Sequence, residues 1–191
     1  MKTVTFKVAG NCPLIMQSDA LADPLNEVAK AIKQITSKQK KTDEDHSRIG
    51  QLEFRGALYY ADDCGPYLPA RNLERMLRDA GALSKLGKKV RMGLQVSDDR
   101  VPLLYAGPRD LAALENDRAF HDRRSVVING KARTIRERPI FREWSLKFSI
   151  LYDEGVFNHD QIKQLVVAAG LYIGIGTYRP RYGRFEVESA K

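Results

Sequence analysis

The residues with the clearest chemical potential lie near the C-terminus, in the segment 177–184. Within eight residues this segment holds three arginines and two tyrosines, namely Tyr178, Arg179, Arg181, Tyr182 and Arg184. Arginine pairs with phosphate, and a tyrosine ring offers a face on which a base can stack. Glycines at 174, 176 and 183 allow close approach of the backbone and could present N–H groups to a phosphate. We therefore expect these five side chains to bind single-stranded nucleic acid. The alternative is a structural turn with its tyrosines packed on the core.

A second cluster of positive charge covers residues 118–147. It contains nine Lys and Arg residues against three acids, which supplies +6 of the chain's net charge of +8. Asn129-Gly130 stands between two β-prone runs and predicts a two-residue hairpin turn. Strand alternation then places Lys131, Arg133 and Ile135 on one face and Arg136 on the other. We expect Lys131, Arg133 and Arg136 to grip a nucleic-acid backbone. A solvated hairpin with scattered arginines is the alternative.

A third basic group lies on a predicted helix that begins after Pro69. Arg71, Arg75 and Arg78 recur at i, i+4 and i+7, so they share one helical face, away from the apolar positions. We expect Arg71 and Arg75 to line the floor of a binding groove. A solvated helix face explains the same pattern without a ligand.

Catalytic patterns are scarce in this sequence. His46, His121 and His159 are isolated, and no two of them stand at metal-ligand spacing. Nucleophile motifs and phosphate-binding glycine motifs are also missing. We therefore expect no catalytic residue, no metal and no cofactor. A metal-independent ribonuclease that uses His46 as general base or acid remains the alternative.

Length and composition indicate a globular protein with a single domain. The chain has 191 residues, of which 43% are hydrophobic, enough to bury a sizeable core. Apolar runs fall short of the roughly 18 residues that span a bilayer, and the N-terminus does not resemble an export signal. We expect a cytoplasmic protein of a prokaryotic cell, with no membrane partner. Cys12 and Cys64 are then free thiols.

The coarse pattern of elements mixes strands and helices without a regular βαβ repeat. A helix is expected to start at Asp23-Pro24, and another at Thr42. Further helices are predicted after Pro69 and after Asn158. Strands are predicted over the ranges 3–8, 90–96, 101–105, 142–152 and 183–187. This mixture favours an α+β fold with a mainly antiparallel sheet.

Three segments resemble the RAMP superfamily of CRISPR-associated proteins. Residues 66–78 (PYLPARNLERMLR) are similar to that superfamily's "YIPASSLKGALR" type of segment. Residues 174–185 look like its C-terminal glycine-rich loop, and residues 12–15 like the break after its opening strand. The three segments follow in the same order. Arg71-Asn72 replaces a small Ser-Ser pair, and Glu74-Arg75 replaces Lys-Gly.

The resemblance implies a ferredoxin-like (RRM-like) core with an antiparallel sheet. We expect one domain over 1–191, with a helical insertion at 24–60 and a projecting basic hairpin at 118–142. In the superfamily's backbone subunits such a hairpin serves as a thumb along a guide RNA. The chain looks like a stand-alone or phage-encoded relative. We expect a non-enzymatic binder of single-stranded RNA or DNA that self-assembles into an oligomer or filament along the strand. A phage assembly or interaction module is a further alternative.

Overall fold

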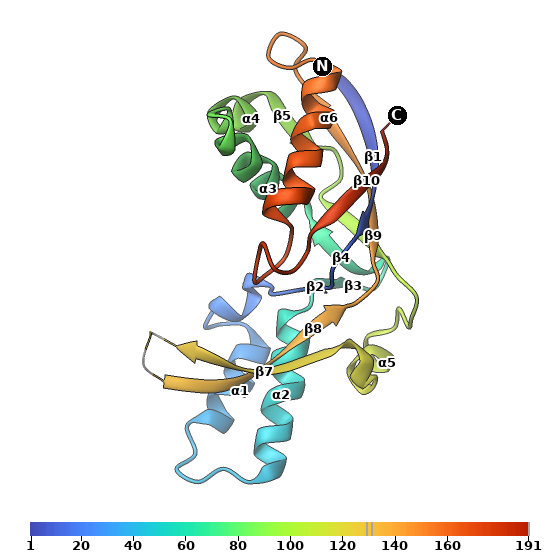
Figure 1. Cartoon of the computed structure of the whole chain (residues 1–191). Coiled ribbons are helices and arrows are strands. Elements are labelled where there is room, and N and C mark those ends of the chain that lie inside the picture. Colours follow the sequence, from blue (N-terminus) through green and yellow to red (C-terminus); the bar gives the residue numbers. More distant parts are fainter. Residues whose placement is uncertain (129, 131, 191) are drawn as a thin grey trace.

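The computed structural model describes residues 1–128, 130 and 132–190 (Figure 1). Its larger sheet is antiparallel throughout. The strand order is β10 (Phe185–Ala190), β1 (Lys2–Gly10), β9 (Ser145–Tyr152), β6 (Arg100–Leu104), β4 (Gly65–Pro69) and β3 (Tyr60–Ala61). β5 (Leu94–Val96) also pairs with β9, at the end of that strand away from β6.

Two interlocked β-α-β units build the core of this sheet. The first runs from β1 through α3 (Ala70–Leu83) to β5 and β6, and the second from β9 through α6 (His159–Ala168) to β10. Because β1 and β9 are neighbours, each unit places a strand inside the other, which is the ferredoxin-like arrangement. Both helices lie on the same side of the sheet, with α4 (Gly87–Gly93) against α3 (Figure 1).

The hydrophobic core lies between these helices and the sheet. Leu73, Met76 and Leu77 recur at i, i+3 and i+4 on α3 and are at most 1% exposed. They belong to the same buried cluster as Phe6 and Phe148, whose rings lie 5.9 Å apart on neighbouring strands. Burying each such side chain contributes about 1.5–3 kcal/mol, so the amphipathic period of α3 holds it on the sheet.

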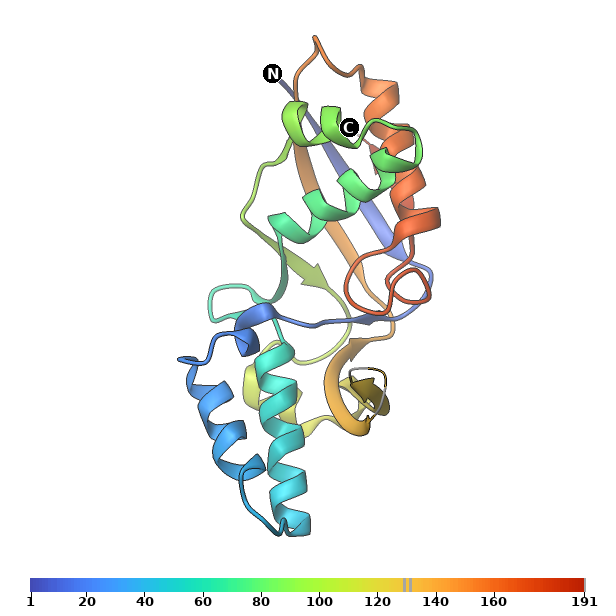
Figure 2. The same ribbon diagram turned by 90° about the vertical axis from the view of Figure 1, so that its left-hand side faces the viewer.

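A second lobe lies below the sheet (Figure 1). It contains η1 (Asp19–Ala22), α1 (Glu27–Thr36), α2 (Asp43–Ala57), α5 (Leu111–Asn116) and η2 (Arg118–Phe120). A small antiparallel sheet completes it, in the order β2 (Leu14–Ile15), β8 (Ala132–Phe141) and β7 (His121–Ile128). α2 packs against both α1 and β8. The β7–β8 hairpin projects from this lobe (Figure 1), and Figure 2 shows it end-on. The two-residue turn predicted at Asn129-Gly130 falls partly outside the described residues, as does Lys131.

Two predicted elements differ from the structure. α1 begins at Glu27 rather than at Pro24, because Asn26 caps it and accepts hydrogen bonds from the N–H groups of Val28 and Ala29. Asp23 instead accepts from the Leu25 N–H in the preceding turn. The strand predicted over 90–96 is α4 up to Gly93 and β5 only from Leu94. Val90 is buried against α3, so tertiary packing decides this segment.

The predicted fold class is confirmed. The chain is α+β with a ferredoxin-like core, an antiparallel sheet and a projecting hairpin. None of the helices in the described residues is long and apolar enough to cross a membrane.

Candidate nucleic-acid interface

The glycine-rich loop, residues 174–183, links the π-helical turn η3 (Ala169–Ile173) to β10 and lies beside β2. The N–H of Ile175 donates to the Gly183 carbonyl at 2.9 Å. The N–H of Thr177 donates to the Ile15 carbonyl, and that of Gly183 to the Pro13 carbonyl, also at 2.9 Å. Gly183 has a φ of 74°, and a Cβ there would lie 1.7 Å from the Ile175 carbonyl oxygen. The N–H of Gly174 likewise donates to the Ala169 carbonyl at 2.8 Å. The expectation that the N–H groups of the loop glycines face a phosphate is therefore wrong for Gly174 and Gly183, whose N–H groups bond to the protein's own carbonyls.

The two tyrosines of the loop face arginines of the hairpin base. Arg138 donates from Nη1 to the Tyr178 hydroxyl at 2.8 Å, and Arg124 from Nη2 to the Tyr182 hydroxyl at 3.1 Å. The Arg124 guanidinium lies 5.3 Å from the Tyr178 ring centroid and 5.0 Å from that of Tyr182. Such distances allow cation–π attraction. The hydrogen bond from Arg124 to Asp122 raises the pKa of Arg124 above its usual range.

Tyr178 is the better placed of the two rings for a ligand. It is 37% exposed, whereas Tyr182 is half-buried against Arg124. Its backbone has a φ of 58°, in the left-handed region that non-glycine residues seldom adopt. Strain of this kind costs about 1–3 kcal/mol and gathers at functional sites. In this conformation Arg138 donates to the Tyr178 hydroxyl, and its guanidinium lies 5.2 Å from the ring centroid.

Asp79 is the electrostatic centre on the other side of the loop. Its carboxylate lies 3.1 Å from Arg75 Nε, 3.8 Å from Arg78 Nη2 and 3.5 Å from Arg179 Nη2. One negative charge therefore holds three guanidiniums, which leaves a local net charge of +2. Arg179 also donates to the Gly174 carbonyl at 3.5 Å, so Asp79 ties the glycine-rich loop to α3.

Three adjoining hollows join these two clusters into one surface. Thr177 and Arg179 border the first hollow, beside Arg75, and the second, beside Asp79. Tyr178 borders the second and the third, which reaches Arg124 and Arg138 on the hairpin. We call this surface the arginine groove and define it by Arg75, Arg124, Arg138, Arg179 and Tyr178.

Arg71 lies just beyond the groove. It pairs with Asp19 at 2.6 Å and borders a smaller hollow on α3. Arg75 and Arg78 border the same hollow, with Arg91 of α4 across from them. The predicted arginine face of α3 is thus one surface, although salt bridges already occupy Arg71 and Arg75.

The hairpin residues divide into exposed and anchored ones. Arg133 is exposed, and Ile135 is 49% exposed, on the part of the hairpin that projects. Arg136 instead donates from Nη1 to the buried carboxylate of Glu53 on α2. Its grip on a nucleic-acid backbone would compete with this ion pair. Lys131 lies outside the described residues.

A buried polar network fastens the hairpin base to α2. His121 Nδ1 and Arg118 Nη1 lie 2.6 and 2.8 Å from Glu137 Oε1. The His121 ring stacks on Phe54 with centroids 4.1 Å apart. Gly50 of α2 permits this approach, because a Cβ there would lie 2.2 Å from Glu137 Oε2. The hairpin therefore projects from a rigid base.

Arg181 of the loop and Arg184 just after it are exposed and do not line the three hollows. Sequence reasoning did not single out Arg124, Arg138 or Tyr172. From the sequence, Arg124 and Arg138 were counted only among the basic residues of 118–147. Their tyrosine partners lie 58 and 40 residues away along the chain, so no local pattern links them. Tyr172, just before the loop, is 62% exposed beside Thr177 and Arg179.

His46 lies exposed on the first turn of α2. That end of α2 points away from the glycine-rich loop (Figure 1). Within the described residues, His, Cys, Asp and Glu side chains form no group that could hold a metal ion.

Comparison with known proteins gives a structural match without a sequence match. No family model matches the chain, and no curated protein is similar to it. Among solved structures, it is similar to a chain in the structure described as "Cryo-EM structure of the Type III-B Cmr-beta bound to cognate target RNA". The TM-score is 0.56 at 14% identity, over 99% of this chain and 59% of that one. The likeness establishes a shared fold, and this chain spans about 59% of its neighbour's length.

Proposed function

We propose that this protein binds single-stranded RNA without cleaving it. The observation that carries the proposal is the arginine groove. It joins the hairpin, the glycine-rich loop and α3, and it combines guanidiniums with an exposed tyrosine ring. Backbone phosphates would lie along Arg75, Arg138 and Arg179, and a base would stack on Tyr178.

Charge along the groove supports phosphate contact. Arg75 and Arg179 share the single carboxylate of Asp79, and Arg138 contacts the neutral groups of Gln17 and Tyr178. The three guanidiniums therefore carry a surplus positive charge that a polyanion can neutralise. Arg133 on the hairpin, Arg181 on the loop and Arg184 just after the loop are exposed and add to this charge.

RNA is preferred over DNA in this proposal because of the structural neighbour. The chain whose fold this protein shares belongs to a complex that was solved bound to a target RNA. By analogy, copies of this protein would assemble side by side along a strand, with each hairpin reaching over it.

The test compares one sequence as single-stranded RNA, single-stranded DNA and duplex, by fluorescence anisotropy at low and moderate salt. We expect the single-stranded RNA to bind most tightly and to weaken steeply with salt. A sigmoidal isotherm on long strands and a hyperbolic one on strands too short for a second copy would support assembly. Equal affinity for the duplex, or affinity indifferent to salt, would contradict the proposal.

The absence of cleavage is tested in the same mixtures. Labelled RNA incubated with the protein in the presence of a chelator should remain intact on a denaturing gel. Fragments that disappear with His46→Ala would replace the proposal with the ribonuclease alternative.

A further inference from the structure

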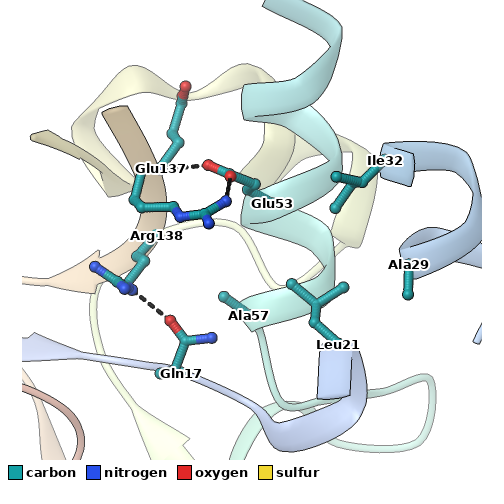
Figure 3. A pocket seen from close by; sticks show the side chains of 9 residues that line it. Gln17, Leu21, Ala29, Ile32, Glu53, Ala57, Glu137 and Arg138 are labelled. Atoms are coloured by element: carbon teal, nitrogen blue, oxygen red, sulfur yellow. Dashed lines mark hydrogen bonds and ion pairs between the residues drawn. The ribbon is translucent and has the colours of Figure 1, made fainter. Parts of the chain in front are cut away.

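A cleft that adjoins the arginine groove at Arg138 lies between α1, α2 and β8. Its volume is about 370 Å3, within the range of small-molecule sites. Figure 3 shows its lining, with apolar side chains on one side and polar ones on the other. The lining residues are Gln17, Leu21, Ala29, Ile32, Glu53, Ala57, Arg136, Glu137 and Arg138.

The apolar wall belongs to η1, α1 and α2. Leu21, Ala29 and Ile32 are half-buried, and the small Ala57 forms the floor. All residues of α1 are exposed or half-buried, and its Ala29 and Ile32 line this cleft. Apolar surface of α1 is thus left open where a flat ring could cover it.

The polar wall presents groups that recognise the edges of bases. Arg138 donates from Nε to Gln17 Oε1, and Arg136 donates from Nη1 to Glu53. The Glu137 N–H holds the other Glu53 oxygen at 3.0 Å. Amide and guanidinium groups are those that hydrogen-bond the edges of purines. Anchored in this way, they are already ordered before a ligand arrives.

Charge decides which part of a nucleotide the cleft suits. Among the described residues of its lining, Arg136 pairs with Glu53, while the Glu137 carboxylate is turned away toward His121 and Arg118 of the hairpin base. A phosphate would lose hydration in the cleft and would be repelled by the Glu53 carboxylate. An uncharged heterocycle would bury its faces on Ile32 and Ala29 and keep its edge hydrogen-bonded.

The cleft also communicates with the groove. Gln17 borders both the cleft and the hollow beside Arg179, and Arg138 borders both the cleft and the hollow beside Tyr178. A strand in the groove would therefore pass the mouth of the cleft. We propose that this cleft binds a nucleobase, supplied either by the bound strand or by a free nucleotide. The first source rests on the proposed function.

The test uses 2-aminopurine, whose fluorescence rises when it leaves a base stack. One probe is 2-aminopurine riboside monophosphate, and the other is a single-stranded RNA with 2-aminopurine at successive positions. Ala29→Leu fills the cleft from α1, while Ala31→Leu on the same helix adds the same atoms outside the lining. Circular dichroism checks that both variants fold.

We expect a fluorescence change of the free nucleotide, or of at least one strand position, with the wild type and Ala31→Leu. Ala29→Leu should abolish that change, while the unlabelled strand still binds through the groove. An equal fluorescence change with Ala29→Leu, or no change with either probe, would contradict nucleobase binding in the cleft.

The two proposals fail in different ways. If a strand binds while neither probe responds, the nucleobase site in the cleft is ruled out and the proposed RNA binding stands. If the free nucleotide responds with the wild type but not with Ala29→Leu, and no strand binds, the nucleobase site is supported and the proposed RNA binding is contradicted.

Discussion

Replacing Arg138 and Arg179 by glutamine should flatten the salt dependence of RNA binding. In the groove, Arg75, Arg138 and Arg179 are the guanidiniums that we assign to phosphates. With about 0.7 per contact for single strands, three contacts give a slope of log K against log salt of about −2.1. Affinity would then fall about 18-fold between roughly 50 and 200 mM salt.

The double variant keeps one of the three contacts. Its slope should be about −0.7, which corresponds to a loss of only about 2.6-fold over the same fourfold range of salt. The assay is fluorescence anisotropy with a labelled single-stranded RNA at five or more salt concentrations. Slopes are more informative than single affinities here, because they count phosphate contacts.

A matched control removes the same charge elsewhere. Arg48 and Arg109 are exposed outside the groove, on α2 and before α5. Arg48→Gln with Arg109→Gln should leave the slope unchanged. The assignment is refuted if this control flattens the slope as much as the groove variant, because net charge alone would then explain binding. A groove variant with the wild-type slope refutes it as well.

Further predictions concern the loop, the hairpin anchor and α2. Gly183→Ala should destabilise the fold and weaken RNA binding, since a φ of 74° alone costs about 1–3 kcal/mol and the Cβ meets the Ile175 carbonyl; denaturant unfolding measures this, with Gly155→Ala as a tolerated control. Glu53→Ala should lower the free energy of unfolding by about 1–3 kcal/mol, because the Glu137 N–H and Arg136 lose their acceptor; an unchanged midpoint would show that the hairpin is not anchored there. The hydrogen bond from Lys38, and then that from the Thr42 N–H, lower the pKa of Asp45. Its stabilising effect is therefore complete above the unfolded value near 3.8 and is lost as the pH falls below it. Unfolding curves of the wild type and Asp45→Asn should converge at low pH and separate above pH 3.8; curves that stay parallel would contradict this.

Local patterns determined much of the fold. The i, i+3, i+4 apolar period of α3, the capping residues Thr42 and Asn158, and the alternation in β9 all predicted elements that the structure contains. These features depend on interactions within a few residues, so the sequence expresses them directly. The mixture of such elements was enough to predict an α+β fold with an antiparallel sheet.

Local patterns were insufficient where two of them compete or where packing overrides them. Asp23-Pro24 resembles a helix start, yet the Asn26 side chain supplies the cap. Val90–Val96 has β-prone ends, yet burial of Val90 against α3 keeps its first half helical. In both segments the local preference is small beside the free energy of burial or capping.

For the interface, the sequence determined the supply of charge and aromatic rings, and tertiary structure decided their use. Counting residues located the basic hairpin and the Tyr-Arg loop. It did not show that the loop's N–H groups of residues 175, 177 and 183 are occupied by the chain's own carbonyls. Nor did it show that Arg124 and Arg138 meet the tyrosines, or that Gln17, α1 and β8 enclose a cleft. These arrangements join residues tens of positions apart, and only the packing of the second lobe under the sheet brings them within hydrogen-bonding distance.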